Sequence, residues 1–396
     1  MDKYLELKPA IDETIAKFYK EMCAFSDDLA DHPEVAHEEY ETSKKIVELL
    51  RREGFEVEYP FAGFETAFKG VYGADDHKYK ICIIVEYDAL PGIGHACAHN
   101  LSGSISILSA FALKELQDEL NADIHVIGTP GEEADGAKPR MANDGVFDGY
   151  DFAMMVHLYD QNLIFTKLNC LASWIFNFHG EASHAGAMPW GGRNALNAAQ
   201  LTMHGLDCIR GCCHPDTRIN TVVHMGGYAA GSIPSEAQIE TWVRHPEYPY
   251  LEKVMERMNN CVKGGALMAE CTWDGYETAP LYKNLKRNNT GEAAIAEVFG
   301  ELGLEINGDH DKLFGSSDAG NVSWQCPAFH PCLQLSERGV TIHTEEFLAC
   351  VKGEKAYKCL EDGAKMIAYT AAKIFTDEEK IAQLKEDFRT YNGTEA

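Results

Sequence analysis

Soft, basic and acidic metal donors recur in the first half of this 396-residue chain. Cys97 and His99 stand two residues apart, and the adjacent acids Glu132 and Glu133 follow them. His157 comes next. Thiolate, imidazole and carboxylate together suit Zn²⁺ or its first-row neighbours. One carboxylate of the adjacent pair can bind metal while the other moves protons, so the set predicts metal-assisted hydrolysis.

The pair Cys97 and His99 alone is a weak signal, because free cysteines and buried histidines are common in protein cores. A thiol nucleophile with His99 as its base is the competing interpretation. A separation of two residues rarely gives that geometry, and it leaves the acidic pair without a role. A further imidazole far downstream, His343, adds another donor, and we therefore prefer the metal site.

Neighbouring residues of an extended loop project in opposite directions. Glu132 and Glu133 are therefore expected to face different sides, one toward metal and the other toward substrate. The segment of residues 128–131 before them, Gly-Thr-Pro-Gly, predicts a tight turn rather than a solvated acidic loop.

The first part of the chain alternates helical and strand-like stretches. Helices are expected over residues 8–30, 42–52 and 102–116, and strands over 57–60, 67–72, 80–85, 123–128 and 151–157. This alternation, with continuously apolar strands, predicts an α/β domain whose mixed, mostly parallel sheet carries helices on both faces. Each expected donor follows one of these strands, at the sheet edge where ligand sites gather.

A second texture begins near residue 171. Strands are expected over residues 173–178, 220–225, 238–244 and 270–278, with helices over 194–210 and 251–269. This β-α-β-β-α-β order is that of the ferredoxin-like motif. It predicts an inserted α+β domain over 171–282, which splits the catalytic domain into 1–170 and 283–396.

Composition excludes several classes of partner. The formal net charge is −27 and the isoelectric point is near 4.9, which disfavours nucleic acid and anionic membranes. Thirteen cysteines without a regular framework, and no apolar leader at Met1, predict reduced thiols and a cytoplasmic location. The longest apolar stretches are too short to cross a bilayer.

Three further residues are candidates for the site. Asp88 can orient a ligand histidine, or it can simply cap a loop. His184, flanked by small residues in the expected insertion, can approach a substrate oxyanion, although a lone loop histidine is more often structural. Arg244 can clamp a substrate carboxylate, and the plainer interpretation is a surface salt bridge.

These residues lie in segments that resemble the dinuclear-metal aminoacylase and amidohydrolase family. That family includes auxin-conjugate hydrolases, p-aminobenzoyl-glutamate hydrolase and related dipeptidases. The matching segments follow the family's order over nearly the whole chain: 32–34, 86–100, 130–133, 183–186, 263–270, 315–318 and 342–344. The similarity is greatest to the branch of p-aminobenzoyl-glutamate hydrolase and the dipeptidases.

The resemblance implies a role for each matching residue. Cys97 would bridge or border two divalent ions, with the shells completed by His99, Glu133, His157 and His343. Glu132 would be the general base and acid. The inserted domain would serve as a lid and pair the chain into a homodimer, and His184 would reach from it into the partner's active site.

The expected reaction is hydrolysis of the amide bond of an N-acyl or N-aroyl amino acid, of the p-aminobenzoyl-glutamate kind, or of a dipeptide. The ions, Mn²⁺ or Zn²⁺ with Co²⁺ as a further option, lower the pKa of a shared water; Glu132 takes its proton, and the hydroxide attacks the carbonyl. A strict dipeptidase is the enzymatic alternative, and a metal-binding pseudoenzyme is the non-enzymatic one. Two departures bear on these alternatives: Ala98 replaces the usual Gly between the ligand Cys and His, and Gly231 stands in place of a substrate-touching Asn.

Overall fold

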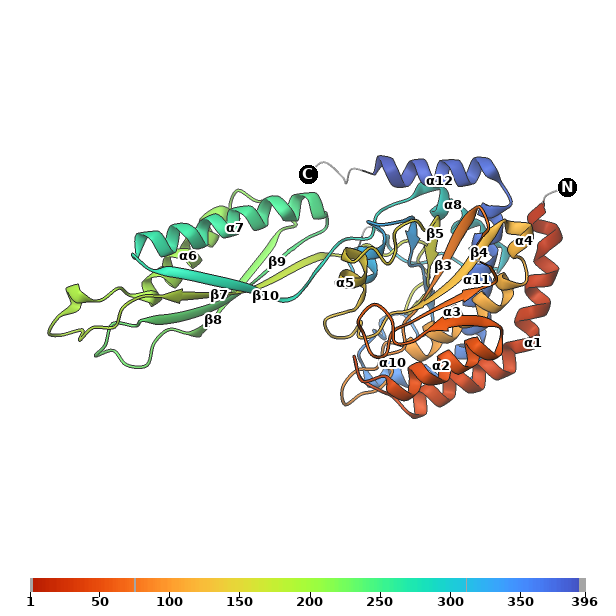
Figure 1. The fold of residues 1–396 in the computed structure, drawn as a ribbon, viewed down its shortest axis with the longest axis horizontal. Helices are drawn as coiled ribbons and strands as arrows, with labels where there is room; N and C mark the ends of the chain where they lie inside the picture. The colour runs from red at the N-terminus through yellow and green to blue at the C-terminus, as the bar shows by residue number, and fades with distance from the viewer. Residues whose placement is uncertain (1–2, 75, 311, 392–396) are drawn as a thin grey trace. The chain divides into compact units, whose positions relative to one another are not determined.

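The computed structural model describes residues 3–74, 76–310 and 312–391 (Figure 1). They form two compact units. Unit 1 comprises Met1–Lys167, Leu285–Leu313 and Asp318–Tyr391, and unit 2 comprises Leu168–Asn284 with Phe314–Ser317.

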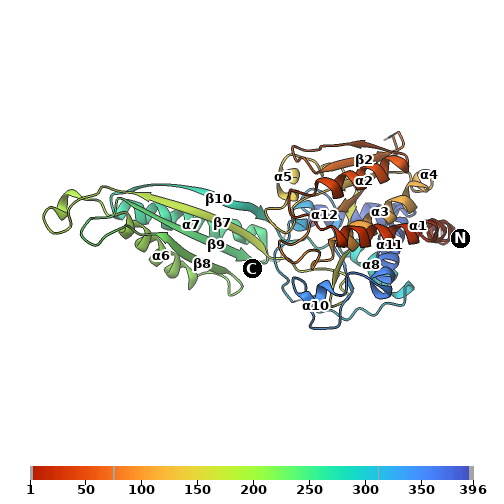
Figure 2. The same ribbon diagram turned by 90° about the horizontal axis from the view of Figure 1, so that it is seen from below.

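A six-stranded sheet forms the centre of unit 1 (Figures 1 and 2). Its order is β1 (Phe55–Glu58), β2 (Phe68–Tyr72), β4 (Ala122–Gly128), β3 (Tyr79–Val85), β5 (Phe152–Met154) and β11 (Ala328–Phe329). The four strands from β4 to β11 pair in parallel, whereas β1 and β2 form an antiparallel edge. The expectation of a mixed, mostly parallel α/β sheet is confirmed.

Helices cover both faces of this sheet. One face carries the long helices α1 (Lys3–Asp31), α3 (His99–Lys114) and α11 (Glu354–Phe375), and the other carries the short helices α5 (Lys138–Asn143) and α9 (Ala319–Val322). Residues of β3 alternate between the two layers: Ile81, Ile83 and Val85 join the core under the long helices, and Cys82 and Ile84 join the opposite core. Burial on both faces explains why this strand is continuously apolar.

Shorter elements complete unit 1. They are α2 (Tyr40–Arg52), α4 (Gln117–Leu120), β6 (His157–Tyr159), α8 (Asn289–Glu301), β12 (Cys332–Gln334), α10 (Glu345–Leu348) and α12 (Glu378–Thr390).

One expected strand, residues 151–157, is divided in two. The backbone leaves β5 at Met154, and His157 opens β6, which pairs in parallel with β12 in a separate two-stranded sheet. The cause is the neighbouring chain: the amide N–H groups of Met155 and His157 donate to carbonyls of Phe329 and Pro331, which continue the pairing into β12. His157 therefore starts a strand instead of ending one.

Unit 2 has a four-stranded antiparallel sheet covered on one face by two helices. The sheet order is β10 (Thr272–Tyr282), β7 (Cys170–His179), β9 (Glu236–His245) and β8 (Arg218–Met225), and the helices are α6 (Ala195–Arg210) and α7 (Tyr248–Met268). The chain order β7-α6-β8-β9-α7-β10 is β-α-β-β-α-β, as in ferredoxin-like motifs. The uncovered face carries exposed apolar side chains, Val222, Trp242 and Tyr276.

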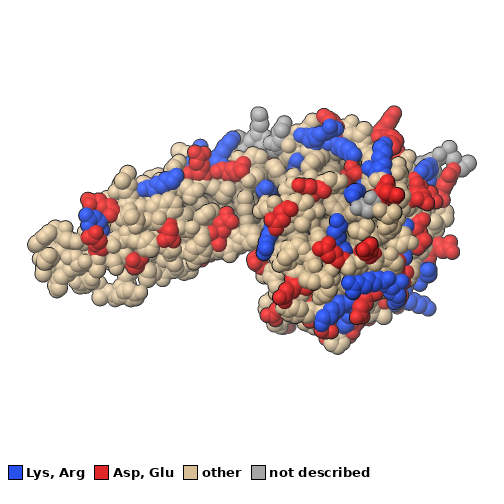
Figure 3. Space-filling model, viewed as in Figure 1, with Lys and Arg blue, Asp and Glu red and all other residues tan. Residues whose placement is uncertain are grey.

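Charged side chains are spread unevenly over the surface. Figure 3 shows Lys and Arg interspersed with Asp and Glu over unit 1, and far fewer charges at one end of unit 2. The loops of residues 182–192 and 226–234 in unit 2 contain none of these four residue types. Across the described ranges, no helix combines the length and the apolar character needed to cross a membrane.

Candidate metal centre

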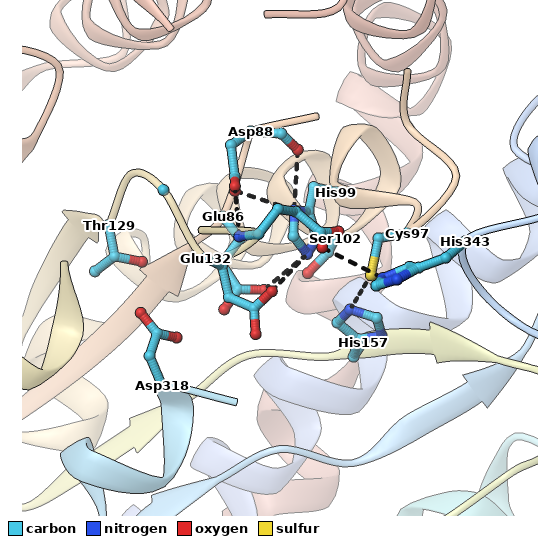
Figure 4. A network of polar contacts seen from close by, with 12 residues as sticks. Glu86, Asp88, Cys97, His99, Ser102, Thr129, Glu132, His157, Asp318 and His343 are labelled. Atoms are coloured by element: carbon cyan, nitrogen blue, oxygen red, sulfur yellow. Dashed lines mark hydrogen bonds and ion pairs between the residues drawn. The ribbon is translucent and has the colours of Figure 1, made fainter. Parts of the chain in front are cut away.

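Separate segments of unit 1 bring the expected donors to one place (Figure 4). Two flank the start of α3, one lies in the turn after β4, one opens β6, and one precedes α10: Cys97, His99, Glu133, His157 and His343. In Figure 4 the side chains of Cys97, His157 and His343 point toward one another.

Cys97 is shared by two sets of three donors. Ligand atoms of Cys97, His99 and His157 all lie within 4.8 Å of one another, and those of Cys97, Glu133 and His343 do the same. The Cys97 Sγ is 3.5 Å from His157 Nε2, and His343 Nε2 is 3.3 Å from Glu133 Oε2. One sulfur common to two such triads is the arrangement needed to hold two ions side by side.

Hydrogen bonds orient two of the imidazoles for metal binding. His157 Nδ1 lies 2.8 Å from the carbonyl of Leu158, and His99 Nδ1 lies 3.0 Å from the carbonyl of Asp88. A carbonyl only accepts, so both Nδ1 atoms carry the proton. Each Nε2 therefore presents a lone pair toward the donor cluster, as metal-ligating histidines require.

Unpartnered atoms show that the site fits metal ions. His99 Nε2 and Glu133 Oε1 are buried, and within the described part of the chain neither makes a hydrogen bond. Leaving buried polar atoms unsatisfied is costly unless a further group completes them. Soft sulfur, imidazole and carboxylate donors are appropriate for divalent transition metals.

The protonation states agree with this use. Burial lowers the pKa of His157 to about 3, so its imidazole is neutral and able to ligate at neutral pH. Burial opposes ionisation of Glu133, but the hydrogen bond with His343 and the charge of His99 lower its pKa to about 2. Burial raises the pKa of the Cys97 thiol well above its usual range, so a bound cation is needed to make it a thiolate.

Glu132 and Glu133 face the same side, which corrects the expectation that they diverge. Ligand atoms of His99, Glu132 and Glu133 lie within 4.8 Å of one another. The extended backbone assumed for that expectation is replaced by a tight turn, in which the carbonyl of Gly131 accepts N–H groups of Ala134 and Gly136. The carboxylate of Glu132 can therefore stand beside the metal donors.

Asp88 joins two of the donors. Its Oδ1 is 3.1 Å from His99 Nδ1, and its Oδ2 accepts the backbone N–H of Glu133 at 2.8 Å. This geometry makes Asp88 more than a loop cap, since one buried carboxylate fixes a ring and a turn together.

A buried ionic cluster next to Glu132 was not expected from the sequence. Ligand atoms of Glu86, Glu132 and Asp318 lie within 4.8 Å of one another. Lys138 Nζ lies 2.6 Å from Glu86 Oε1 and 2.7 Å from Asp318 Oδ1, and all three of these side chains are at most 1% exposed. Burial and the charges of Glu86 and Asp318 raise the pKa of Glu132, which is the direction a proton-transferring carboxyl needs.

Sequence signals for this cluster existed in part. Glu86 and Asp318 lie within the family-like segments 86–100 and 315–318, but nothing in those segments indicates a lysine partner. Lys138 lies between them in the chain, and only the fold brings it into contact with both.

Ala98, between two of the donors, has a left-handed backbone with φ +63° and ψ +29°. Glycine adopts this region freely, whereas other L-residues carry a cost of about 1–2 kcal/mol. The Cβ of Ala98 is buried in the core under the long helices. The departure from glycine is therefore accommodated, and the donors on either side stay in place.

The two remaining candidates, His184 and Arg244, belong to unit 2, and the structure does not bring them together with the donors. His184 Nδ1 accepts backbone N–H groups of Gly186 and Ala187 at 3.2 and 3.1 Å. Its neutral form must therefore carry the proton on Nε2, as a donor. Arg244 lies 5.0 Å from the Trp242 ring and, among described residues, forms no salt bridge with an acid.

A loop of unit 2 contacts the His184 segment directly. Ala185 donates its N–H to the carbonyl of Gly231, and Ile233 donates to that of Ser183. A pocket of about 450 Å³ lies beside this pairing, lined by apolar side chains that include Leu196, Tyr228 and Ile233. A Cβ at Gly231 would meet no atom within 4 Å, so space is not what selects glycine there.

Comparison with known proteins gives consistent matches. A profile of the peptidase family M20/M25/M40 matches residues 73–373. The Xaa-Arg dipeptidase of Mus musculus is 28% identical and covers 97% of this chain and 92% of its own length. One of the subunits of the p-aminobenzoyl-glutamate hydrolase of Escherichia coli is 25% identical and covers 98% and 96%. A solved dinuclear metal-binding peptidase of Bacillus subtilis has the same fold, with a TM-score of 0.68 at 19% identity over 90% of this chain and 98% of that one.

Proposed function

Because the chain belongs to the peptidase family M20/M25/M40, we propose that it hydrolyses the amide bond between an acyl, aroyl or aminoacyl group and an amino acid whose carboxylate is free. The observation that carries this proposal is the pair of donor triads that share Cys97, with the Glu132 carboxyl beside them. The residue sets for the two ions are Cys97, His99 and His157, and Cys97, Glu133 and His343.

When bound, two divalent ions supply an acidified water and a polarised carbonyl. Glu132 accepts the proton of the attacking water and returns it to the leaving amine, a double role that its raised pKa favours. Asp88 holds His99 and the backbone of Glu133 in register throughout. Mn²⁺ and Zn²⁺ both suit the donors, with Co²⁺ a further option, and elemental analysis of the purified protein will distinguish them.

Unit 2 serves in this proposal as a lid and dimerisation domain. His184 donates from Nε2 to the oxyanion in the active site of a partner subunit, which is worth about 3–4 kcal/mol for a typical donor. The uncharged loops around it, with exposed Met188, Trp190 and Tyr228, are suited to burial against a second copy. Arg244, without an acidic partner among described residues, is available to bind the substrate carboxylate.

A dipeptide is the narrower substrate, favoured by the similarity to an Xaa-Arg dipeptidase along nearly the whole chain. N-acyl and N-aroyl amino acids are the broader class, favoured by the similarity to p-aminobenzoyl-glutamate hydrolase. Neither match fixes the group on the amino side of the scissile bond.

The test is product detection by mass spectrometry after incubation with a pooled panel of dipeptides, N-acyl amino acids and aroyl-glutamates. Protein loaded with Mn²⁺ or Zn²⁺ is compared with chelator-treated protein and with Glu132→Gln. Chelator-sensitive release of a free amino acid, absent in Glu132→Gln, is expected. Two bound ions with no release from any panel member would contradict the proposal and favour a ligand-binding pseudoenzyme.

Mixing two inactive variants tests the role of His184. Glu132→Gln and His184→Ala are each expected to be nearly inactive. If His184 acts across a dimer, subunit exchange creates mixed dimers with one intact site, and about a quarter of the wild-type activity returns. Activity that stays at the level of the separate variants after exchange would contradict action in trans.

A further inference from the structure

A buried carboxylate outside the donor set holds the turn that carries the catalytic and metal-binding glutamates. Glu39, at the start of α2, is fully buried. Its Oε1 accepts the backbone N–H of Gly131 at 2.9 Å, one residue before Glu132 and 92 residues away in the chain. Among the described residues, no other side chain accepts the Gly131 N–H.

Gly131 is the centre of the turn. Its carbonyl accepts the N–H groups of Ala134 and Gly136 at 3.1 and 2.9 Å, so the turn closes on this residue. Its φ is +78°, and a Cβ there would lie 2.5 Å from the ring of His37. The backbone of Gly131 is therefore packed directly against the loop that carries Glu39, and a shift of this residue moves Glu132.

The Glu39 carboxylate is itself held at three points. Oε1 also accepts the backbone N–H of His37 at 2.9 Å, and Oε2 accepts the Thr66 hydroxyl at 2.8 Å. The His37 ring reaches Asp135, further along the same turn, at 2.5 Å. The segment 37–39 thus grips the turn at two positions, and the carboxylate has no freedom to follow a displaced Gly131.

Two other carboxylates bind backbone N–H groups of the same stretch. Asp88 accepts from Glu133 at 2.8 Å, and Asp318 accepts from Lys138 at 3.3 Å. Of the three, Asp88 also touches the donor His99 and Asp318 also pairs with the Lys138 ammonium. Glu39 makes neither contact, so its link to the site runs through the backbone of Gly131.

We propose that Glu39 is a positioning residue for the hydrolytic reaction, which sets the place of the Glu132 carboxyl by fixing the Gly131 backbone. This inference rests on the proposed function, because it assigns Glu39 to the action of Glu132 as base. Displacement of a catalytic group by about 1 Å can lower a rate about 100-fold. Removal of Glu39 is expected to lower kcat by about that factor, with KM and metal content unchanged.

The chain offers graded variants and a matched control. Glu39→Ala removes the acceptor, and Glu39→Asp keeps the charge on a shorter side chain that no longer spans the gap. Glu39→Gln keeps an amide oxygen for Gly131 and should restore kcat to within about tenfold of wild type. The control is Glu34→Ala, since the Glu34 carboxylate on the same loop accepts only N–H groups of Glu41 and Thr42, in α2.

The deciding experiment combines Glu39→Ala with Glu132→Gln. If Glu39 acts through Glu132, its substitution costs about 100-fold in the wild-type background and less than about threefold in Glu132→Gln. Equal losses in both backgrounds would show a general structural effect and overturn the proposal. A loss of bound metal in Glu39→Ala would also overturn it, because Glu133 would then be the residue displaced.

Hydrogen exchange gives a readout that needs no turnover. The peptide containing Gly131–Glu133 should exchange faster in Glu39→Ala and Glu39→Asp than in wild type or Glu34→Ala, and unchanged exchange would overturn the proposal. Absence of amide hydrolysis in the metal-loaded wild type would instead overturn the proposed function, and with it any catalytic role for Glu39. The two failures are therefore distinguishable.

Discussion

Replacing Lys138 by Met tests the buried ionic cluster beside the metal donors. Methionine has a similar length and no charge, so Glu86 and Asp318 lose the ammonium that lies 2.6 and 2.7 Å from them. Removing one partner of a single buried ion pair costs about 3–5 kcal/mol, because the other charge stays buried. Here two carboxylates are left, so we expect a loss of about 5 kcal/mol in the free energy of unfolding at pH 8.

The loss should depend on pH in a definite direction. Even beside Lys138, burial raises the pKa of Asp318 from 3.8 to about 6, so the folded chain binds this proton more tightly than the unfolded chain. Such a group destabilises the fold progressively as pH rises from 3.8 through about 6. Burial opposes ionisation of Glu86 as well, and the charges of Lys138 and His99 lower its pKa to about 2. Without Lys138 both carboxyls retain protons to higher pH, so the loss should be smaller at pH 5 than at pH 8.

The assay is urea unfolding of metal-free protein, followed by circular dichroism at pH 5 and pH 8. Wild type, Lys138→Met, Asp318→Asn and the double variant form a cycle. The double variant should be more stable than Lys138→Met alone, because one unpaired carboxylate has been removed. A loss below about 1 kcal/mol at pH 8, or the same loss at both pH values, would refute the reasoning.

Three further outcomes are expected. Glu132→Gln should retain two ions per chain by elemental analysis while kcat falls at least about 1,000-fold, and retained turnover would remove Glu132 from its role. His343→Ala should lower the content to about one ion, because it removes a donor from only one triad; an unchanged content would exclude His343 as a ligand. Partial burial opposes ionisation of Glu301, but hydrogen bonds from Lys373, Lys8 and Tyr4 lower its pKa to about 2. Its stabilisation, about 1 kcal/mol after screening by water, is present above pH 4.5 and lost as pH falls through about 2, so Glu301→Gln should destabilise at pH 7 and have no effect at pH 2.

The parts of this site that the sequence predicts are those whose residue type already states the chemistry. Cys97, His99 and Glu133 are rare donors after apolar strands, and parallel strands end at one edge, so their meeting followed from the order of elements. The position of His157 at a strand boundary was predictable, but its separate strand was not. That strand depends on pairing with residues 332–334, which no local pattern reveals.

The supporting residues could not be predicted, because their function comes from contacts over long distances in the chain. Glu39 is one of several acids in a helical start, and only its fully buried carboxylate and the bond to Gly131 distinguish it. Lys138 would be placed at the surface by any rule of composition, since lysine is seldom buried without partners. The direction of Glu132 was wrong for a related reason: turn geometry replaced the assumed extended backbone.

The pairing of the two ends of unit 2 bears on how the polypeptide folds during synthesis. Leu171 at its start is the β-sheet partner of Tyr282 at its end, and Asn284 donates its N–H to the Cys170 sulfur at 3.0 Å. A loop of about 120 unfolded residues would cost about 4 kcal/mol to close, and a unit 2 that folds first removes that entropic cost. We expect unit 2 to fold before α11 emerges to complete the other core, and His343 to be the last of the metal donors to arrive.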